Sequence, residues 1–354
     1  MLATLSRTIP LGDYTYEPKW DGFRCLAFVH ARDVDLRSRH DRPLARYFPE
    51  VVESLLAAAN GRNLVLDGEI VLSPDVPFEF SVLMDRLHPA ASRVDRLSRE
   101  TPSAYVAFDL LADGNEDLRG RPFIERRDRL VRVLDGVSGR VRVTPATRDP
   151  GVATGWLARF EGGGIDGVVA KPDDVRYAAG RRALVKVKRQ RTADCVVAGI
   201  RLMDVPAVRS LLLGLHDPVG RLRHVGVVTQ LPRGERVALI TELGPLAIPL
   251  EEHPWRDGFE IGGSPLGRLK GSAARWMPDM DLDWVPLRPE RVAEVGFDQV
   301  DGDRFRHPAR LLRWRPDREA SSCTLDQIET TGSDRSAIFA ASASSVVPSM
   351  GHRP

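Results

Sequence analysis

Lysine is scarce in this chain, and most of its lysines lie in short apolar stretches. Of the 51 lysines and arginines, only five are lysines: Lys19, Lys171, Lys186, Lys188 and Lys270. An ammonium group can lose its proton when it is buried or placed beside positive charge, whereas a guanidinium group stays protonated. Only lysine can therefore act as an amine nucleophile. We predict this role for Lys19, in TYEPKWDGFR at 15–24; a solvated strand lysine is the open alternative.

Three pairs of charged residues stand two positions apart in predicted strands. Side chains two apart share one face of a strand. Apolar residues flank the acidic pair, and valines alternate with the two lysines of the last pair. Burying charge beside an apolar layer is costly unless a partner or ligand compensates. We therefore expect one cleft to receive all three faces, which carry Glu17 with Lys19, Asp67 with Glu69, and Lys186 with Lys188.

The predicted cleft contains the groups that phosphate chemistry needs. Mg²⁺ commonly binds through one or two carboxylates together with substrate phosphates and water, and lysine and arginine bind phosphates. Such a set predicts phosphoryl or nucleotidyl transfer by positioning and charge neutralisation. An internal salt-bridge network among the same residues is an equal alternative. The groups are the carboxylates Glu69 and Asp166 and the cations Arg24, Arg39, Lys186 and Lys188.

Length and composition predict a soluble two-domain protein of the cytoplasm. A chain of 354 residues exceeds the usual size of a single core. It is 42% hydrophobic and 28% charged, and it has no run of 18 apolar residues and no secretory signal pattern. Cys25, Cys195 and Cys323 lack the paired spacing of a zinc site or disulfide framework, so we expect reduced thiols.

Basic residues gather in two patches although the net charge is only +2. Between Lys171 and Arg201 there are nine basic residues against three acids, and between Arg304 and Arg318 six arginines against one aspartate. Local basic patches favour polyanion contact. A solvated charged face is an equal alternative for each patch alone.

The pattern of apolar residues predicts mixed helices and strands in the first half. Helices are expected at 45–60, about 123–135 and about 150–161, and a buried strand at 64–72. From about 193 to 318, short turn-bounded β segments predict a small barrel with a helix at about 233–244. The segment beyond residue 318 is rich in serine and alanine, which predicts a poorly ordered tail.

A family resemblance decides between the alternatives. KWDGFR at 19–24 matches the K-x-D-G-x-R lysine motif of the covalent nucleotidyltransferases, which are the DNA ligases, RNA ligases and mRNA capping enzymes. The other motifs follow in order: SRH at 38–40, LDGEIV at 66–71, AFDLL at 107–111, GIDGVVAK at 164–171, LVKVK at 184–188 and RWRPDR at 313–318. Up to about residue 325 the chain resembles the small stand-alone bacterial ATP-dependent DNA ligases of the ligase C type, including HPW at 253–255 and VPLRPERV at 285–292.

The resemblance implies an α+β fold in two domains. A nucleotidyltransferase (adenylation) domain with antiparallel sheets would span 1–191, an OB-fold β-barrel 192–318, and a disordered tail 319–354. The implied activity is sealing of 5′-phosphate/3′-hydroxyl nicks in duplex DNA during repair, through a lysyl-AMP and a DNA-adenylate, with ATP and Mg²⁺ or Mn²⁺. Nicked duplex DNA and other repair proteins would be partners of a monomer that contacts no membrane.

The resemblance also implies roles for single residues. Lys19 would attack the α-phosphate of ATP, Glu17 would bind near the adenine amino group, and Phe108 would stack on the base. Glu69 and Asp166 would hold the metal, although the family usually has glutamate at the second position. Arg24 and Arg39 would contact the ribose and phosphates or the nick's 5′-phosphate, and Arg182 would contact the nucleotide. Lys186 and Lys188 would bind the α-phosphate. The pyrophosphate would be oriented by Arg315, Asp317 and Arg318. Arg318 replaces the family's usual lysine.

Two rivals share parts of this pattern. An RNA ligase or a capping guanylyltransferase has the same lysine motif, and covalent labelling with ATP rather than GTP, with preference for a nicked DNA duplex, would exclude them. A catalytically idle DNA-binding module would keep the fold but form no adenylate. The intact Lys19, Glu69 and Lys186 argue against the idle module.

Overall fold

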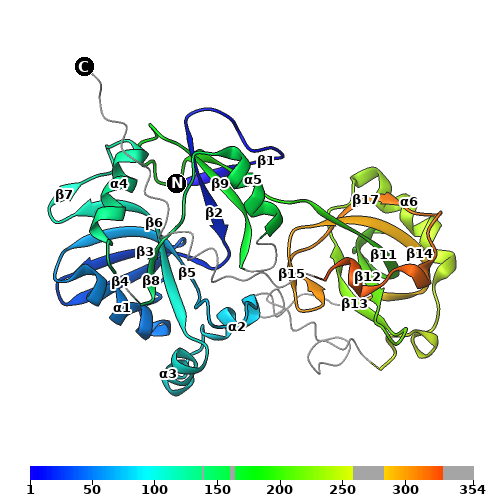
Figure 1. Cartoon of the computed structure of the whole chain (residues 1–354). Helices are drawn as coiled ribbons and strands as arrows, with labels where there is room; N and C mark the ends of the chain where they lie inside the picture. The colour runs from blue at the N-terminus through cyan, green and yellow to red at the C-terminus, as the bar shows by residue number, and fades with distance from the viewer. Residues whose placement is uncertain (138, 160–163, 258–282, 330–354) are drawn as a thin grey trace. The chain divides into compact units, whose positions relative to one another are not determined.

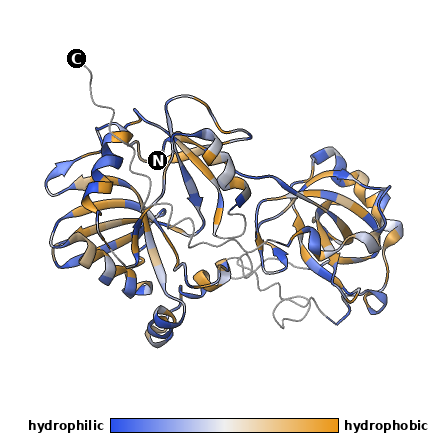
Figure 2. Cartoon of the chain, in the orientation of Figure 1, coloured by the Kyte–Doolittle hydropathy of each residue, from blue (hydrophilic) through white to orange (hydrophobic). Residues whose placement is uncertain are grey.

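The structure, a computed structural model, describes residues 1–137, 139–159, 164–257 and 283–329. It divides into two compact units, Met1–Arg189 and Gln190–Thr330 (Figure 1). This division falls close to the predicted boundary between residues 191 and 192. No helix in the described ranges is long and apolar enough to cross a membrane. Hydrophobic residues alternate with hydrophilic ones along many strands of both units (Figure 2).

The larger sheet of the first unit has six strands in the order β4-β3-β5-β6-β7, with β8 paired to β6. Its neighbours are antiparallel except for β6 and β8, which run parallel. Its strands are β3 (Phe23–His30), β4 (Asp33–Ser38), β5 (Leu64–Leu72), β6 (Ser103–Asp113), β7 (Glu116–Asp117) and β8 (Val141–Val143).

Helices cover this sheet by burying one apolar face. The predicted helix at 45–60 is divided into a 3-10 turn, η1 (Ala45–Tyr47), and α1 (Pro49–Ala59), because proline lacks an N–H donor and favours the first helical position. α1 buries Val51 and Leu55 in the core formed with β3, β5 and β6. The other helices between 80 and 133 are α2 (Phe80–Asp85), α3 (Ala91–Glu100) and α4 (Phe123–Val133).

The second sheet of this unit has four strands in the order β1-β10-β9-β2. β1 and β10 are parallel, and the other neighbours are antiparallel. Trp156 of α5 (Pro150–Arg159) packs with Trp20 and Val168 on this sheet. Three segments that carry predicted site residues thus become neighbours. The strands are β1 (Leu2–Ser6), β2 (Tyr14–Trp20), β9 (Ile165–Pro172) and β10 (Arg182–Val187).

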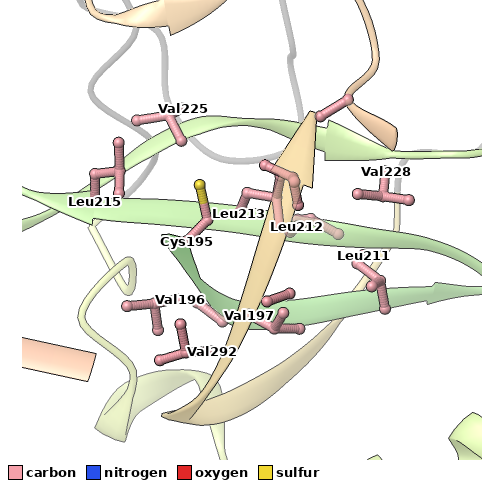
Figure 3. Packing of buried hydrophobic residues seen from close by; sticks show 14 of the residues in the cluster. Cys195, Val196, Val197, Leu211, Leu212, Leu213, Leu215, Val225, Val228 and Val292 are labelled. Carbon is pink, nitrogen blue, oxygen red and sulfur yellow. The ribbon is translucent and has the colours of Figure 1, made fainter. Parts of the chain in front are cut away.

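The second unit contains a five-stranded antiparallel sheet in the order β13-β12-β11-β14-β17 and a two-stranded antiparallel sheet of β15 and β16. A further parallel bridge joins Val228 to Ala309 and so brings β13 toward the segment before β17, as a barrel requires. Its valines, leucines and Cys195 fill the interior (Figure 3). The strands are β11 (Arg191–Leu202), β12 (Val208–His216), β13 (Leu222–Val228), β14 (Val285–Phe297), β15 (Val300–Asp301), β16 (Arg304–Phe305) and β17 (Arg310–Trp314).

The connection after β13 packs on the barrel through its aromatic and polar groups. It holds α6 (Arg233–Leu243) and two 3-10 turns, η2 (Gly244–Leu246) and η3 (Leu250–Glu252). In the HPW motif, His253 Nε2 lies 2.9 Å from the Ala198 carbonyl oxygen, and Trp255 Nε1 donates to the Leu222 carbonyl at 2.8 Å. This motif therefore has a structural place in the barrel.

The beginning of the predicted disordered tail is folded. Residues 319–329 form two 3-10 turns, η4 (Ala320–Ser322) and η5 (Leu325–Gln327), and Cys323 and Ile328 are buried in the barrel core. The prediction of a poorly ordered segment from residue 319 is corrected here, because a few well-spaced apolar side chains suffice to fix a short segment on an existing core. The rest of the predicted tail, 330–354, lies outside the described residues.

Candidate active site

The predicted nucleophile lies in a chain of alternating charges. Lys19 Nζ, on β2, lies 2.6 Å from Asp166 Oδ1 on β9, and Lys188 Nζ lies 2.9 Å from Asp166 Oδ2. The Asp166 side chain is only 5% exposed, whereas that of Lys19 is 26% exposed. β9 pairs with both β2 and β10, so one buried carboxylate links the lysine motif to the lysine that follows β10.

Two glycines allow the strands of this site to approach closely. A Cβ atom on Gly22, in KWDGFR, would lie 2.1 Å from the Ile70 carbonyl oxygen of β5. A Cβ atom on Gly167, next to Asp166, would lie 2.2 Å from the Val187 carbonyl oxygen. Any larger side chain at either position would push the strands apart, which explains glycine in both motifs.

Glu69 on β5 is the second candidate metal ligand. Burial raises the pKa of its carboxyl to about 8, against the lowering effect of Lys19 and with a further raising effect of Asp21. The sensitivity to Lys19 shows that Glu69 lies in the electrostatic range of the nucleophile. The described residues contain no cluster of three or more acidic, histidine or cysteine side chains that could hold a metal. Two carboxylates near the lysines predicted to bind phosphate fit an ion that also binds substrate phosphates.

Arg24 is partly exposed and is fixed by a buried carboxylate. Its Nε and Nη2 bind Asp67 Oδ1 and Oδ2 at 3.0 and 2.7 Å, and Tyr177 donates to Asp67 Oδ2 at 2.9 Å. A third donor, Nη1, binds the carbonyl oxygen of Met1. The predicted salt-bridge network is therefore present at this pair, alongside the predicted cluster around Lys19.

A separate buried cluster surrounds Glu17. Its two carboxylate oxygens accept from Arg127 Nη1 and Lys171 Nζ, each at 2.7 Å. Lys171 Nζ also donates to the Phe108 carbonyl at 2.8 Å and lies 4.8 Å from the centre of the Phe108 ring and 4.5 Å from that of Phe123. The side chains of Glu17 and Lys171 are 3% and 4% exposed. A compact ammonium fits between two rings and two oxygens, which a planar guanidinium would not.

Lys171 and Arg127 had no role in the predicted site. Lys171 is one of the few lysines of the chain and lies in an apolar stretch, so the scarcity of lysine was the signal that could have identified it. Arg127 lies on α4, 110 residues from Glu17, and no local pattern links the two.

Three predicted site residues of the first unit remain: Arg39, Arg182 and Lys186. Arg39 lies in an exposed turn after β4, and Arg182 is exposed at the start of β10. Within the described ranges, neither makes a hydrogen bond or ion pair with another predicted site residue. Lys186 lies on β10 opposite Val169 of β9 and is partly buried.

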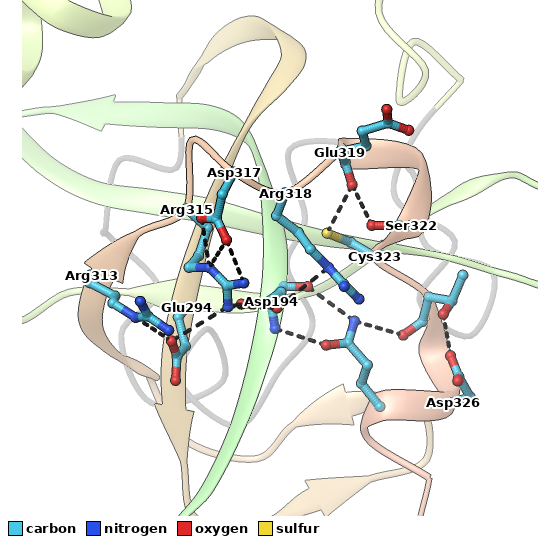
Figure 4. A network of polar contacts seen from close by, with 12 residues as sticks. Asp194, Glu294, Arg313, Arg315, Asp317, Arg318, Glu319, Ser322, Cys323 and Asp326 are labelled. Atoms are coloured by element: carbon cyan, nitrogen blue, oxygen red, sulfur yellow. Dashed lines mark hydrogen bonds and ion pairs between the residues drawn. The ribbon is translucent and has the colours of Figure 1, made fainter.

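The last motif, RWRPDR at 313–318, lies on the second unit, and acidic side chains hold its arginines. Arg315 binds Asp317 through Nε and Nη2 at 3.0 and 2.9 Å, and its Nη1 lies 3.0 Å from Asp194 Oδ1. Arg318 Nε lies 3.5 Å from Asp194 Oδ2 (Figure 4). Asp194, on β11, had no place in the predicted site, because only tertiary pairing brings it to the motif.

Comparisons with known proteins show the family of this chain. The family model "ATP dependent DNA ligase domain" matches residues 1–188, and "ATP dependent DNA ligase C terminal region" matches residues 206–318. DNA ligase C2 of Mycolicibacterium smegmatis is 49% identical over 333 residues, covering 93% of this chain and 94% of that protein. DNA ligase C of Mycobacterium tuberculosis is 47% identical over 335 residues, covering 93% of each.

A solved structure named Pmar-Lig_Pre. shares the fold, with a TM-score of 0.57, at 15% identity over 89% of this chain and 67% of that one. The family resemblance and the fold class of an adenylation domain followed by an OB-fold are confirmed. The chain therefore belongs to the family of ATP-dependent DNA ligases, enzymes that use ATP to seal nicks in DNA.

Proposed function

We propose that this chain seals 5′-phosphate/3′-hydroxyl nicks in duplex DNA through a covalent adenylate on Lys19. The observation that carries the proposal is the placement of Lys19 and Lys188 on the two oxygens of one buried carboxylate, Asp166. This arrangement fixes the amine beside a cation suited to the α-phosphate of ATP.

The first step forms a bond between nitrogen and phosphorus. The lone pair of Lys19 Nζ attacks the α-phosphorus of ATP, the bond from that phosphorus to the bridging oxygen breaks, and pyrophosphate leaves while the amine releases a proton. Lys186 and Lys188 bind the α-phosphate and neutralise charge that develops there. Arg315, Asp317 and Arg318 orient the leaving pyrophosphate.

The two later steps transfer AMP and then release it. The 5′-phosphate of the nick attacks the lysyl-AMP phosphorus, so that the N–P bond breaks and a DNA-adenylate forms. The 3′-hydroxyl then attacks the 5′-phosphate, forms the phosphodiester bond and displaces AMP. Arg24, Arg39 and Arg182 bind the ribose and phosphates of the nucleotide or the 5′-phosphate of the nick.

Glu69 and Asp166 are the residues that would hold a divalent ion, Mg²⁺ or Mn²⁺. When bound, the ion supplies positive charge to the phosphates and to the leaving group. The protein's own contribution is to hold Glu69 in a partly buried position, where desolvation raises the pKa of its carboxyl to about 8. A divalent cation offsets that cost of ionisation.

The base site is formed by Phe108 and Glu17. Phe108 stacks on the adenine, and Glu17 accepts from the adenine amino group. A carboxylate has about four acceptor positions, so Glu17 can make this contact while it keeps Arg127 and Lys171. We further propose that the protein works as a monomer in the cytoplasm, on nicked duplex DNA and with other repair proteins.

Covalent labelling tests the proposal. Purified protein is incubated with ATP labelled at the α-phosphate and a divalent ion, and the label is then chased with nicked duplex DNA. We expect labelling of the wild type, transfer of label to DNA, and no labelling of Lys19→Ala or Lys19→Arg. Labelling of Lys19→Ala would refute the assigned nucleophile. Preferential labelling by GTP, or sealing of RNA in preference to DNA, would favour the related nucleotidyltransferases.

A further inference from the structure

The two arginines of RWRPDR share one carboxylate on a different strand. Asp194 of β11 binds Arg315 Nη1 through both oxygens, at 3.0 and 3.1 Å, and lies 3.5 Å from Arg318 Nε (Figure 4). Asp317, the acid inside the motif, pairs with Arg315. In the described part of the barrel, Asp194 is the carboxylate with ion pairs to both arginines.

The pairing fixes where the two guanidinium groups lie. Arginine side chains carry much rotamer freedom, and a planar guanidinium loses it when carboxylates hold more than one edge. Asp317 holds the Nε and Nη2 edge of Arg315, and Asp194 holds its Nη1. Because Asp194 is also paired with Arg318, its position sets the spacing between the two cations.

Asp194 is itself fixed by the segment after the motif. Its backbone is opposite Glu294 of β14, but the pairing of β11 with β12 begins only at Val196. The Gln327 side chain takes the open edge: Asp194 N–H donates to Gln327 Oε1 at 2.9 Å, and Gln327 Nε2 donates to the Asp194 carbonyl at 3.1 Å. The amide of Gln327 thus replaces a neighbouring strand at this position.

We propose that Asp194 is a positioning residue for adenylation, which acts by holding Arg315 and Arg318 at the spacing that a pyrophosphate group requires, with Gln327 fixing Asp194. The inference rests on the proposed role of this motif in the first step. A phosphate group recognised by two arginines needs both at a fixed separation. Asp317 and Arg318 are 64% and 40% exposed, but Arg315 and Asp194 are only 18% and 13% exposed, so the Tm of each variant is measured beside its rate of labelling.

Two assays on the full chain separate positioning from folding. The first measures the rate of covalent labelling against ATP concentration. The second measures sealing of a nick that already carries AMP on its 5′-phosphate, a reaction in which no pyrophosphate leaves. Asp194→Asn keeps the size and one acceptor oxygen but removes the charge. Glu290→Gln is the matched control, because it removes one acid that pairs with Arg288 on the same barrel.

We expect Asp194→Asn to lower the rate of labelling about tenfold, the scale of one charge-assisted hydrogen bond, and to leave sealing of the pre-adenylated nick within about twofold of wild type. Glu290→Gln should leave both rates within about twofold. Asp194→Glu, which keeps the charge, should label faster than Asp194→Asn. Gln327→Leu should lower labelling without changing sealing, because Asp194 keeps its charge but loses its fixed backbone.

Arg315→Ala separates the proposed role of the RWRPDR motif from the proposed role of Asp194. If Arg315→Ala labels like wild type, the proposed role of the motif is wrong. If Arg315→Ala loses labelling while both Asp194→Asn and Gln327→Leu keep it, the positioning inference alone is overturned. Equal losses of labelling and sealing in Asp194→Asn and Gln327→Leu, with a lowered Tm, would show a purely structural role. In the Arg315→Ala background, Asp194→Asn should cause a smaller loss than in the wild type, because only Arg318 is left to position.

Discussion

Replacing Lys171 by methionine should destabilise the first unit and weaken ATP binding together. The Lys171 ammonium is 4% exposed and holds Glu17 at 2.7 Å and the Phe108 carbonyl at 2.8 Å. Breaking a buried ion pair costs about 3–5 kcal/mol. For a unit of this size, 1 kcal/mol lowers the Tm by about 2–4 °C, so Lys171→Met should lower it by about 6–20 °C. Methionine is unbranched and only one atom shorter than lysine, so loss of charge dominates.

The assay is thermal unfolding of wild type and variant, followed by the ATP dependence of labelling. Because Lys171 fixes the backbone of Phe108, we expect the KM for ATP to rise about fivefold or more, the lower end of the contribution of a stacked base. The matched control is Arg99→Met, which removes an exposed cation paired with Asp95 and should lower the Tm by less than about 4 °C. A Lys171→Met protein that melts and labels like Arg99→Met would refute this reasoning.

Three further predictions concern the base site, the last motif and the barrel core. Phe108→Ala should raise the KM for ATP about 5- to 150-fold in the labelling assay, because a stacked base contributes about 1–3 kcal/mol; an unchanged KM would remove Phe108 from the base site. Arg315→Ala should slow labelling far more than sealing of a pre-adenylated nick, and equal losses in the two assays would contradict its role. Burial, with Arg304 and Arg201 nearby, lowers the pKa of His224 well below its usual range. Below about pH 6.5, His224 therefore binds a proton in the unfolded chain but stays neutral in the folded chain. Denaturant unfolding should show stability falling from about pH 7 to 5, and less steeply in His224→Gln; equal slopes would exclude His224 as the source.

The sequence was sufficient to predict the fold class and the gathering of charged side chains around Lys19. Lysine scarcity and the ordered motifs identify Lys19, and the two-residue spacing on strands predicts that charged faces meet. In the structure Lys19, Asp166 and Lys188 do meet, and Glu69 lies within the electrostatic range of Lys19. Strong local patterns were enough here because the residues concerned lie in apolar strands that become neighbours.

The sequence left two environments open for Arg24, because the choice between them depends on tertiary pairing. Arg24 was expected at the nucleotide or, alternatively, in an internal salt-bridge network, and the structure pairs it with Asp67 across β3 and β5. Asp194 reaches the last motif only because β11, β14 and β17 are neighbours in one sheet. The folding of residues 319–329 was also missed, since composition measures average polarity and not the placement of Cys323 and Ile328 on a core.

Peptide mapping of the adenylated protein by mass spectrometry tests the central claim most directly. Protein incubated with ATP and a divalent ion is denatured, digested and analysed, before and after addition of nicked duplex DNA. We predict one AMP group on the peptide that contains Lys19, and its loss when nicked DNA is added. AMP on another residue, or no AMP on any peptide of a folded protein, would contradict it.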